Sequence, residues 1–295
     1  MVTSLQLMDI EEQPLEYSFD IVCVYNNKQV LDDVFLPYYI NNKNDALFRL
    51  HPVDNRQNIF ESAVEAFNSV LPECLGKWIL FSHQDVALLS EHWLEQCADM
   101  LYTLSNWAVA GVAGMVPEGE TNEQRGRSVV RTGVSLEVQE WWPWGNEITA
   151  STKVQTVDEL LFIIPRALLQ QLPFDGSTCD SWHLYAVDYS LSAKEALGLD
   201  TYVLPLLVYH QSSGIRKKRL QIVLSLGPLP HSYYKTLRKV LIKHRSAYKF
   251  IFTTCSHWHT GCPLVFQRIW KLTVGFYELI LRKFRHMFSS AKTIQ

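Results

Sequence analysis

The sequence predicts an α/β fold in which a mostly parallel central sheet is covered by helices on both faces. Short apolar runs alternate with segments whose apolar residues recur at the helical period, which is the pattern of such sheets. The run Trp78–Phe81 is apolar at four consecutive positions, which indicates a strand buried on both faces. A chain of 295 residues is long enough for one large domain with an appendage.

The alternation of strands and helices continues to about residue 210. Strands are predicted where β-branched and apolar residues cluster, at 20–25, 46–53, 78–81, 109–116, 154–164 and 201–209. Helices are predicted where the apolar period is close to 3.6, at 30–39, 58–71, 90–104, 166–171 and 181–197. The polar segment 117–131 predicts a loop.

The net charge of −3 hides a strong asymmetry along the chain. Residues 211–295 hold sixteen lysines and arginines and a single acid, Glu278, whereas residues 1–210 hold eleven basic and twenty-nine acidic residues. We therefore divide the chain into a globular unit, 1–214, and a basic helical region, 215–295, with helices near 233–250 and 264–288. Basic residues interleaved with Trp and Phe on the second helix predict contact with an anionic membrane surface, and a helix packed on the main domain is the alternative.

The cysteines and the chain start predict a cytoplasmic protein. Six cysteines are scattered without the spacing of a disulfide framework, which favours reduced thiols. The N-terminus has no charged-then-apolar signal sequence, and no run of about 18 uncharged apolar residues occurs. We expect a cytoplasmic location, peripheral at the inner face of the membrane.

The residues that follow the buried strand 78–81 are the first candidates for a site. His83, Gln84 and Asp85 lie at its carboxyl end, where ligands sit in open α/β sheets. An acid there is suited to hold a hard divalent cation against phosphate oxygens. Taken alone, Asp85 is better explained as the cap of the next helix, and the other motifs along the chain are what favour a site.

Taken together, these segments resemble a family 2-type glycosyltransferase with the GT-A (nucleotide-diphospho-sugar transferase) fold. The likeness is to the bacterial subgroup linked to capsule and other surface-polysaccharide synthesis, and it spans roughly residues 18–214. The motifs that carry it are Tyr25-Asn26, the helix with Asn58, Glu61, Ala66 and Asn68, the strand end Ser82–Val86, and the segment from Thr156 to Gly214, in which Leu172–Asp175 and Ser181–Leu191 are the most specific parts.

The resemblance implies a divalent metal, Mn²⁺ or Mg²⁺, bound to the donor diphosphate. Asp85 matches the last acid of the family's short acidic metal motif, but His83 stands where the family usually has a second acid. His210 matches a histidine that many relatives carry after a later strand. A neutral imidazole is an acceptable partner for manganese. A histidine that bonds locally at a strand end is the alternative for His210.

The resemblance also implies a catalytic base. Asp188 matches the family's acid at the start of a helix beneath the acceptor, and the outcome would be inversion by a single displacement. Family members often have two adjacent acids here, and this chain has Val187 before Asp188. Helix capping or acceptor binding by Asp188 stays open.

Donor and acceptor contacts follow from the same resemblance. The resemblance implies a nucleotide-sugar donor, most commonly a UDP-sugar in the family, and a hydroxyl acceptor on a glycan or a lipid-linked molecule. Turn chemistry and core packing explain the same residues, so both interpretations remain. The donor residues would be Tyr25, Asn26, Asp54, Asn58 and Asp85, and the acceptor residues Asp158, Glu159, Trp182 and His183.

Some features of the sequence also fit other classes of protein. A non-catalytic relative that binds nucleotide or glycan is favoured by the single acid at the strand end. A nucleotidyltransferase normally has a glycine-rich loop after its first strand, where this chain has Asn26-Asn27-Lys28. The acidic first part argues against nucleic acid as a partner. The close spacing of Cys255, His257, His259 and Cys262 resembles half of a zinc site, but no second ligand pair follows.

Overall fold

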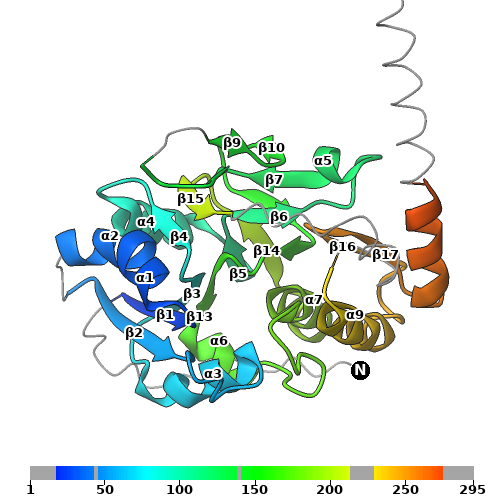
Figure 1. The fold of residues 1–295 in the computed structure, drawn as a ribbon, viewed down its shortest axis with the longest axis horizontal. Coiled ribbons are helices and arrows are strands. Elements are labelled where there is room, and N and C mark those ends of the chain that lie inside the picture. The colour runs from blue at the N-terminus through cyan, green and yellow to red at the C-terminus, as the bar shows by residue number, and fades with distance from the viewer. Residues whose placement is uncertain (1–17, 43–45, 138–140, 213–228, 275–295) are drawn as a thin grey trace, which may run out of the picture.

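The structure is a computed structural model that describes residues 18–42, 46–137, 141–212 and 229–274 (Figure 1). The predicted basic stretch 216–219 and the second half of the predicted helix 264–288 lie outside the described residues.

A mixed seven-stranded sheet forms the centre of the molecule. Its order is β11 (Thr152–Val154), β14 (Asp200–Val203), β5 (Trp107–Gly111), β13 (Leu161–Pro165), β3 (Trp78–His83), β1 (Phe19–Tyr25) and β2 (Phe48–Asp54). Five strands share one direction, while β13 is antiparallel to β3 and β5, and β11 is antiparallel to β14. The prediction of a mostly parallel sheet is therefore met only in part.

The two faces of this sheet bury different sets of side chains. Along β3, Trp78 and Leu80 pack into one core cluster, and Ile79 and Phe81 pack into the other. This alternation is the two-residue period of a strand covered on both sides, as predicted from the apolar run. The first cluster is covered by α2 (Leu36–Asn41) and α4 (Trp93–Thr103), and the second by α3 (Ala63–Val70), α6 (Arg166–Gln171) and α7 (Tyr185–Leu197) (Figure 1).

Several predicted elements differ from the observed ones in extent. The predicted helix 30–39 is a continuous helical segment made of α1 (Lys28–Val30), a π-helical turn Leu31–Phe35 and α2. The predicted helix 58–71 begins only at Ala63, because the Asn55 side chain bonds the backbone of Phe60 and Ser62 caps the helix. Asn58 has a positive φ of 53°, which a helix does not allow.

Three predicted strands are each divided between sheets, and one predicted loop is ordered structure. The segment 109–116 contributes to β5 and β6 (Ala113–Met115), 154–164 to β12 (Thr156–Val157) and β13, and 201–209 to β14 and β15 (Val208–Gln211). The loop prediction for 117–131 is wrong, because this segment contains α5 (Asn122–Arg125) and β7 (Gly126–Ser128) and the start of β8 (Val130–Gly133). Two four-stranded sheets result, β10-β7-β6-β12 and β4-β15-β8-β9, with β4 at Val86–Leu88, β9 at Trp142–Pro143 and β10 at Asn146–Glu147.

The described part of the C-terminal region packs against the main domain. Helix α9 (His231–Lys243) lies beside α7, and the two helices share a buried cluster that includes Leu184, Leu191, Leu237 and Val240 (Figure 1). Helix α9 ends at Lys243, before the predicted end at residue 250, and a hairpin of β16 (Phe250–Thr253) and β17 (Ser256–His259) follows. Residues 264–274 are helical. Within the described residues, no helix is long and apolar enough to cross a membrane.

Candidate active site

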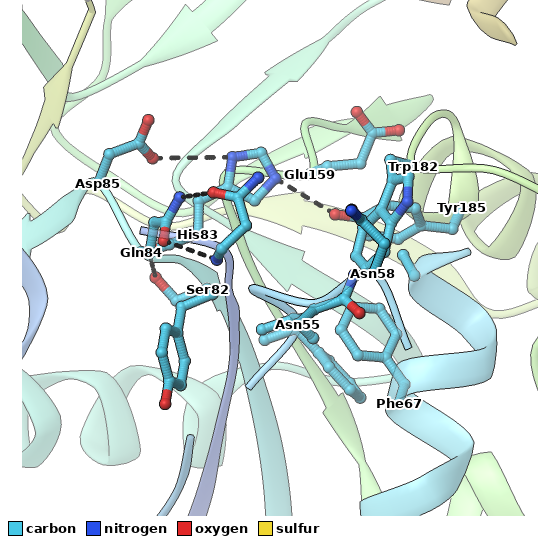
Figure 2. A pocket seen from close by; sticks show the side chains of 15 residues that line it. Asn55, Asn58, Phe67, Ser82, His83, Gln84, Asp85, Glu159, Trp182 and Tyr185 are labelled. Carbon is cyan, nitrogen blue, oxygen red and sulfur yellow. Dashed lines mark hydrogen bonds and ion pairs between the residues drawn. The ribbon is translucent and has the colours of Figure 1, made fainter. Parts of the chain in front are cut away.

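A cavity of about 400 Å³ opens at the carboxyl ends of β1, β2 and β3. This is the edge at which ligands bind in open α/β sheets. Its walls come from segments far apart in the sequence, and Figure 2 shows the side chains that line it. Among the lining residues are Tyr25, Asn26, Asn58, His83, Gln84, Asp85, Glu159, Trp182 and Tyr185.

One carboxylate and two imidazoles form a compact cluster at this cavity. The ligand atoms of His83, Asp85 and His210 all lie within 4.8 Å of one another. His210 Nε2 is 3.6 Å from Asp85 Oδ2, and His83 Nδ1 is 4.0 Å from Asp85 Oδ1. Asp85 Oδ1 is buried and has no hydrogen-bond partner among the described residues. A buried carboxylate oxygen without a partner calls for a cation or a proton donor at this position.

The local folding explains why these three residues meet. Strand β4 begins directly after Asp85 and pairs antiparallel with β15, so that His210 lies opposite Val86. The backbone amide of Gln211 donates to the Asp85 carbonyl at 2.8 Å, which fixes the turn. His83, the last residue of β3, is two residues before Asp85 and lines the same cavity.

The carboxylate and the imidazoles of the cluster shift one another's pKa values. Burial favours the protonated form of Asp85, but the imidazoles of His210 and His83 outweigh it and lower the pKa of Asp85. Burial also acts to lower the pKa of His210, but the adjacent Asp85 carboxylate raises this pKa overall. Burial lowers the pKa of His83, which keeps this imidazole neutral and able to bind a metal.

Tyr185 orients His83 from the opposite side. Its hydroxyl is hydrogen-bonded to His83 Nε2 at 3.2 Å, and Figure 2 shows His83 lying between Tyr185 and Asp85. With Nε2 engaged, Nδ1 is the ring nitrogen that faces Asp85. Such outer partners fix the tautomer and the ring orientation of metal-binding histidines.

Glu159 is the other carboxyl group of the cavity. Strand β13 runs antiparallel to β3, so the residues that precede β13 arrive at the same edge of the sheet, and the His83 amide donates to the Leu160 carbonyl at 2.9 Å. Glu159 Oε1 is buried without a partner in the described chain. Burial, and then the charge of Asp158, raise the pKa of Glu159 well above its usual value. A carboxyl group with a raised pKa is a strong proton acceptor once ionised.

The backbone next to Glu159 is strained. Leu184 precedes α7 with φ of 66° and ψ of 12°, a left-handed conformation that is uncommon for leucine. The Leu184 backbone acts to lower the pKa of Glu159 and partly offsets the effect of burial on that carboxyl group. Strain of this kind is concentrated at functional sites.

The loop after β1 is held in place by Gln84. Its Oε1 accepts from the amides of Asn26 at 3.0 Å and Asn27 at 2.9 Å, and its Nε2 donates to Asn26 Oδ1 at 2.7 Å. Asn55 completes this wall, because its amide donates to the Tyr25 carbonyl at 2.8 Å. This wall of the cavity is thus built from the ends of three neighbouring strands.

The structure brings only part of the predicted donor and acceptor set to the cavity. Tyr25, Asn26, Asn58, Asp85, Glu159 and Trp182 line it, and Trp182 is exposed at 38 %. Asp54 does not line it and instead pairs with Arg56 at 2.6 Å. His183 does not line it either, and its ring lies 5.6 Å from that of Tyr233.

Asp158 serves the architecture around the cavity. Its Oδ1 accepts from the Leu160 amide at 3.0 Å, and its Oδ2 accepts a short hydrogen bond from Thr254 in the β16–β17 turn. The same turn is held by Asn122, which donates to the carbonyls of Thr253 and Thr254. The hairpin of the C-terminal region therefore reaches the acidic pair Asp158-Glu159.

Asp188 is not placed for the role predicted from the sequence. It is 3 % exposed, does not line the cavity, and accepts from Lys243 Nζ at 2.8 Å while its other oxygen is 2.9 Å from His244 Nε2. Both carboxylate oxygens are thus engaged by cationic or hydrogen-donating groups of α9. These are the contacts of a structural anion between α7 and α9, a pairing that the sequence alone could not reveal, and the base role that the resemblance implies stays a prediction.

The cysteines and histidines in and after the hairpin do not come together as a metal site among the described residues. Only two groups of candidate metal ligands come together among the described residues, and neither includes Cys255, His257, His259 or Cys262. The second group, Asp20, His51 and Cys74, is a buried hydrogen-bonded set in which Asp20 accepts from the Gly76 amide at 2.7 Å. All six cysteines are free thiols, as predicted.

The sequence analysis did not name His83 as a candidate metal ligand or Tyr185 as its hydrogen-bond partner. The spacing of His83 and Asp85 was a usable signal, because residues two apart at the end of a strand point to one side. Tyr185 gave no such signal, since its contact with His83 spans 102 positions.

No family model matches this sequence, and no curated protein does. Solved structures similar to this chain include S. aureus TarS in complex with UDP-GlcNAc, with a TM-score of 0.42, 15% identity, and coverage of 79% of this chain and 74% of that one. GalNAc-T7 with UDP, GalNAc and Mn²⁺ gives a TM-score of 0.43, 10% identity, and coverage of 71% and 48%.

The catalytic domain of Drosophila β1,4-galactosyltransferase 7 with xylobiose gives a TM-score of 0.40, 11% identity, and coverage of 70% and 73%. At these identities and TM-scores the similarity concerns the fold and establishes no family and no activity for this chain.

Proposed function

We propose that this protein is a metal-dependent glycosyltransferase that moves a sugar from a nucleotide-diphosphate sugar, with UDP-sugar as the expected donor, to a hydroxyl acceptor. The observation that carries the proposal is the His83–Asp85–His210 cluster, of which His83 and Asp85 line the same cavity as Glu159 at the strand ends. An inverting displacement and an acceptor from surface-polysaccharide or glycoconjugate synthesis, on a glycan or a lipid carrier, complete the proposal. They rest on the sequence resemblance.

The residues present fit a divalent metal ion. One carboxylate and two imidazoles, with an orphaned Asp85 oxygen among them, form a donor set suited to Mn²⁺, whereas Mg²⁺ prefers oxygen ligands alone. A divalent cation held there supplies positive charge to the diphosphate leaving group. Asn26, which Gln84 fixes, and Tyr25 would face the nucleoside.

Glu159 takes the base role in this proposal. The acceptor oxygen forms a bond to the anomeric carbon, the bond from that carbon to the diphosphate oxygen breaks, and the acceptor proton passes to the Glu159 carboxylate. Trp182 at the mouth offers an aromatic face to the apolar side of a sugar ring. Asp158 and Thr254 would position the acidic pair rather than touch the reacting atoms.

The test of the metal site uses Asp85→Ala. We expect Mn²⁺-dependent binding of UDP to weaken by roughly 100-fold, because the carboxylate between the two imidazoles is lost. Isothermal titration of UDP with Mn²⁺, Mg²⁺ or no metal measures this, and Mn²⁺ should support the tighter binding. The melting temperature should hardly change.

The matched control is Asp33→Ala, which removes an exposed acid that does not line the cavity. Metal-independent UDP binding, or unchanged binding by Asp85→Ala, would contradict the proposal. A hydrolysis and transfer screen across nucleotide sugars with Mn²⁺ then identifies the donor.

A non-catalytic binding protein is the second candidate. The single acid at the end of β3 and the ion-paired Asp188 favour it. Metal-dependent binding of a nucleotide sugar without hydrolysis or transfer, over the whole screen, would decide for this candidate.

A further inference from the structure

The helix formed by residues 264–274 presents its apolar side chains outward. Phe266 and Trp270 are 63% and 69% exposed, and Val265 and Ile269 are also exposed. These four positions lie one turn apart in two pairs, so they form a single face. Monomeric proteins rarely display such a continuous apolar strip.

The polar side of the same helix faces the protein. Gln267 donates to the carbonyls of His259 and Cys262 at 2.8 Å and accepts from the His259 amide. The Arg268 guanidinium lies 3.8 Å from the ring centre of Tyr234, and the Lys271 ammonium 5.0 Å from that of Trp258. Leu264 also packs inward, against the cluster shared by α7 and α9, so the helix is anchored to the protein while Val265, Phe266, Ile269 and Trp270 stay exposed.

A basic groove runs beside this helix. It has a volume of about 900 Å³ and lies between α9 and residues 260–268. Five basic side chains line it, and no acidic side chain does among the described residues; the five are His231, Lys235, Arg238, Lys239 and Arg268. Lys235 and Lys239 share Asp180 as a partner, but Arg238 is exposed and forms no ion pair within the described chain. Exposed Ile242 adds apolar surface to the same groove.

We infer that this face docks on a bilayer that contains anionic phospholipid. The occupant is assigned by charge complementarity together with the exposed aromatic strip. Cations beside outward Trp and Phe suit the interface, where rings enter the headgroup layer and cations meet lipid phosphates. Nucleic acid would satisfy the cations but would leave the strip Val265–Phe266 and Ile269–Trp270 in water. Beyond the described residues, the sequence adds Arg282, Lys283, Arg285 and Lys292.

The inference is tested on the full chain by co-sedimentation with vesicles of phosphatidylglycerol or of phosphatidylcholine. We expect binding to phosphatidylglycerol at low salt, weak binding to phosphatidylcholine, and loss of binding as salt is raised. Trp270→Glu and Arg238→Glu should each weaken binding by roughly tenfold or more, since each places an acid at the lipid surface. Thermal unfolding of each variant shows that it is folded.

Two controls match these changes elsewhere on the molecule. Trp142→Glu alters another half-exposed tryptophan, and Arg245→Glu makes the same charge reversal on an exposed arginine outside the groove. Both should bind nearly as the wild type does. No binding by the wild type, equal binding to both lipids, or equal losses in test and control variants would overturn the inference.

Discussion

At the scale of single residues, the cavity separates two kinds of carboxyl group. Asp85 lies between two imidazoles and has a lowered pKa, so it is ionised and ready to bind a cation. Glu159 is buried beside Asp158, and its pKa is raised well above the usual value. In the proposed function, these two carboxyl groups, whose environments drive their pKa values apart, would divide charge stabilisation and proton transfer between them.

Glu159→Gln tests this division. We expect turnover to fall by about 10²-fold or more, with affinity for the donor retained, because only the proton acceptor is lost. The melting temperature should stay near that of the wild type, because burial disfavours the charged form of this carboxyl group and the amide is nearly isosteric. Single-turnover transfer kinetics and thermal unfolding measure the two effects.

The exposed Glu118→Gln is the control. Because a raised pKa keeps Glu159 protonated in more acidic solution, wild-type turnover should fall as the pH decreases through that pKa. Full activity of the glutamine variant would rule out Glu159 as the base.

At the scale of elements, strand direction builds the site. The antiparallel insertion of β13 delivers Glu159 to the edge where β3 delivers His83 and Asp85. The pairing of β15 with β4 sets His210 against Asp85. On the other side of the sheet, α7 and α9 are joined by a charged cluster of Asp175, Asp188 and Glu195 with Lys243 and His244. This cluster assigns Asp188 to structure.

Asp188→Asn tests that assignment. We expect the free energy of unfolding to fall by about 2–4 kcal/mol, because the change leaves Lys243 and the buried His244 without their shared anion. Turnover of the folded variant should be retained, in contrast to Glu159→Gln. Urea unfolding and activity assays at low temperature make the comparison.

The exposed Asp99→Asn serves as the control on a different helix. A stable but inactive Asp188→Asn protein would return this residue to the catalytic role expected from the resemblance.

At the scale of the whole molecule, the C-terminal region contacts the main domain through ion pairs and through apolar packing. The acids Asp175, Asp180 and Asp188 of the main domain pair with lysines of α9. Part of the charge asymmetry seen in the sequence is therefore neutralised within the molecule. The division at residue 214 stays a prediction about domains, but the described contacts make the two parts interdependent.

A chain that ends at Gly214 tests this interdependence. It would expose the apolar side of α7, including Leu184, Val187 and Leu191, and would remove the partners of Asp188. We expect a loss of stability of more than about 5 kcal/mol, comparable with the whole stability of a typical domain, and hence aggregation or early unfolding. Differential scanning calorimetry of the two chains measures it. A truncated chain that melts cooperatively at the full-length temperature would show that 1–214 folds alone.

The sequence by itself determined the α/β class, the buried strand 78–81, the helix–strand order and the strand-end position of Asp85. Local period, β-branched content and cap residues are written in neighbouring positions, so they can be read without a fold. It also placed Tyr25, Asn26, Asn58, Glu159 and Trp182 among the candidates that the structure brings to the cavity.

Only the tertiary structure decided which of these residues act together. Contacts across about a hundred positions bring His83 to Tyr185 and His210 to Asp85. Packing between separate elements buries Asp188 against α9 and leaves the apolar face of residues 264–274 exposed. Pattern within one segment fixes which side of a helix or strand is apolar. The partner that covers that side, and the charge that meets a buried carboxylate, are set by the packing of the whole chain.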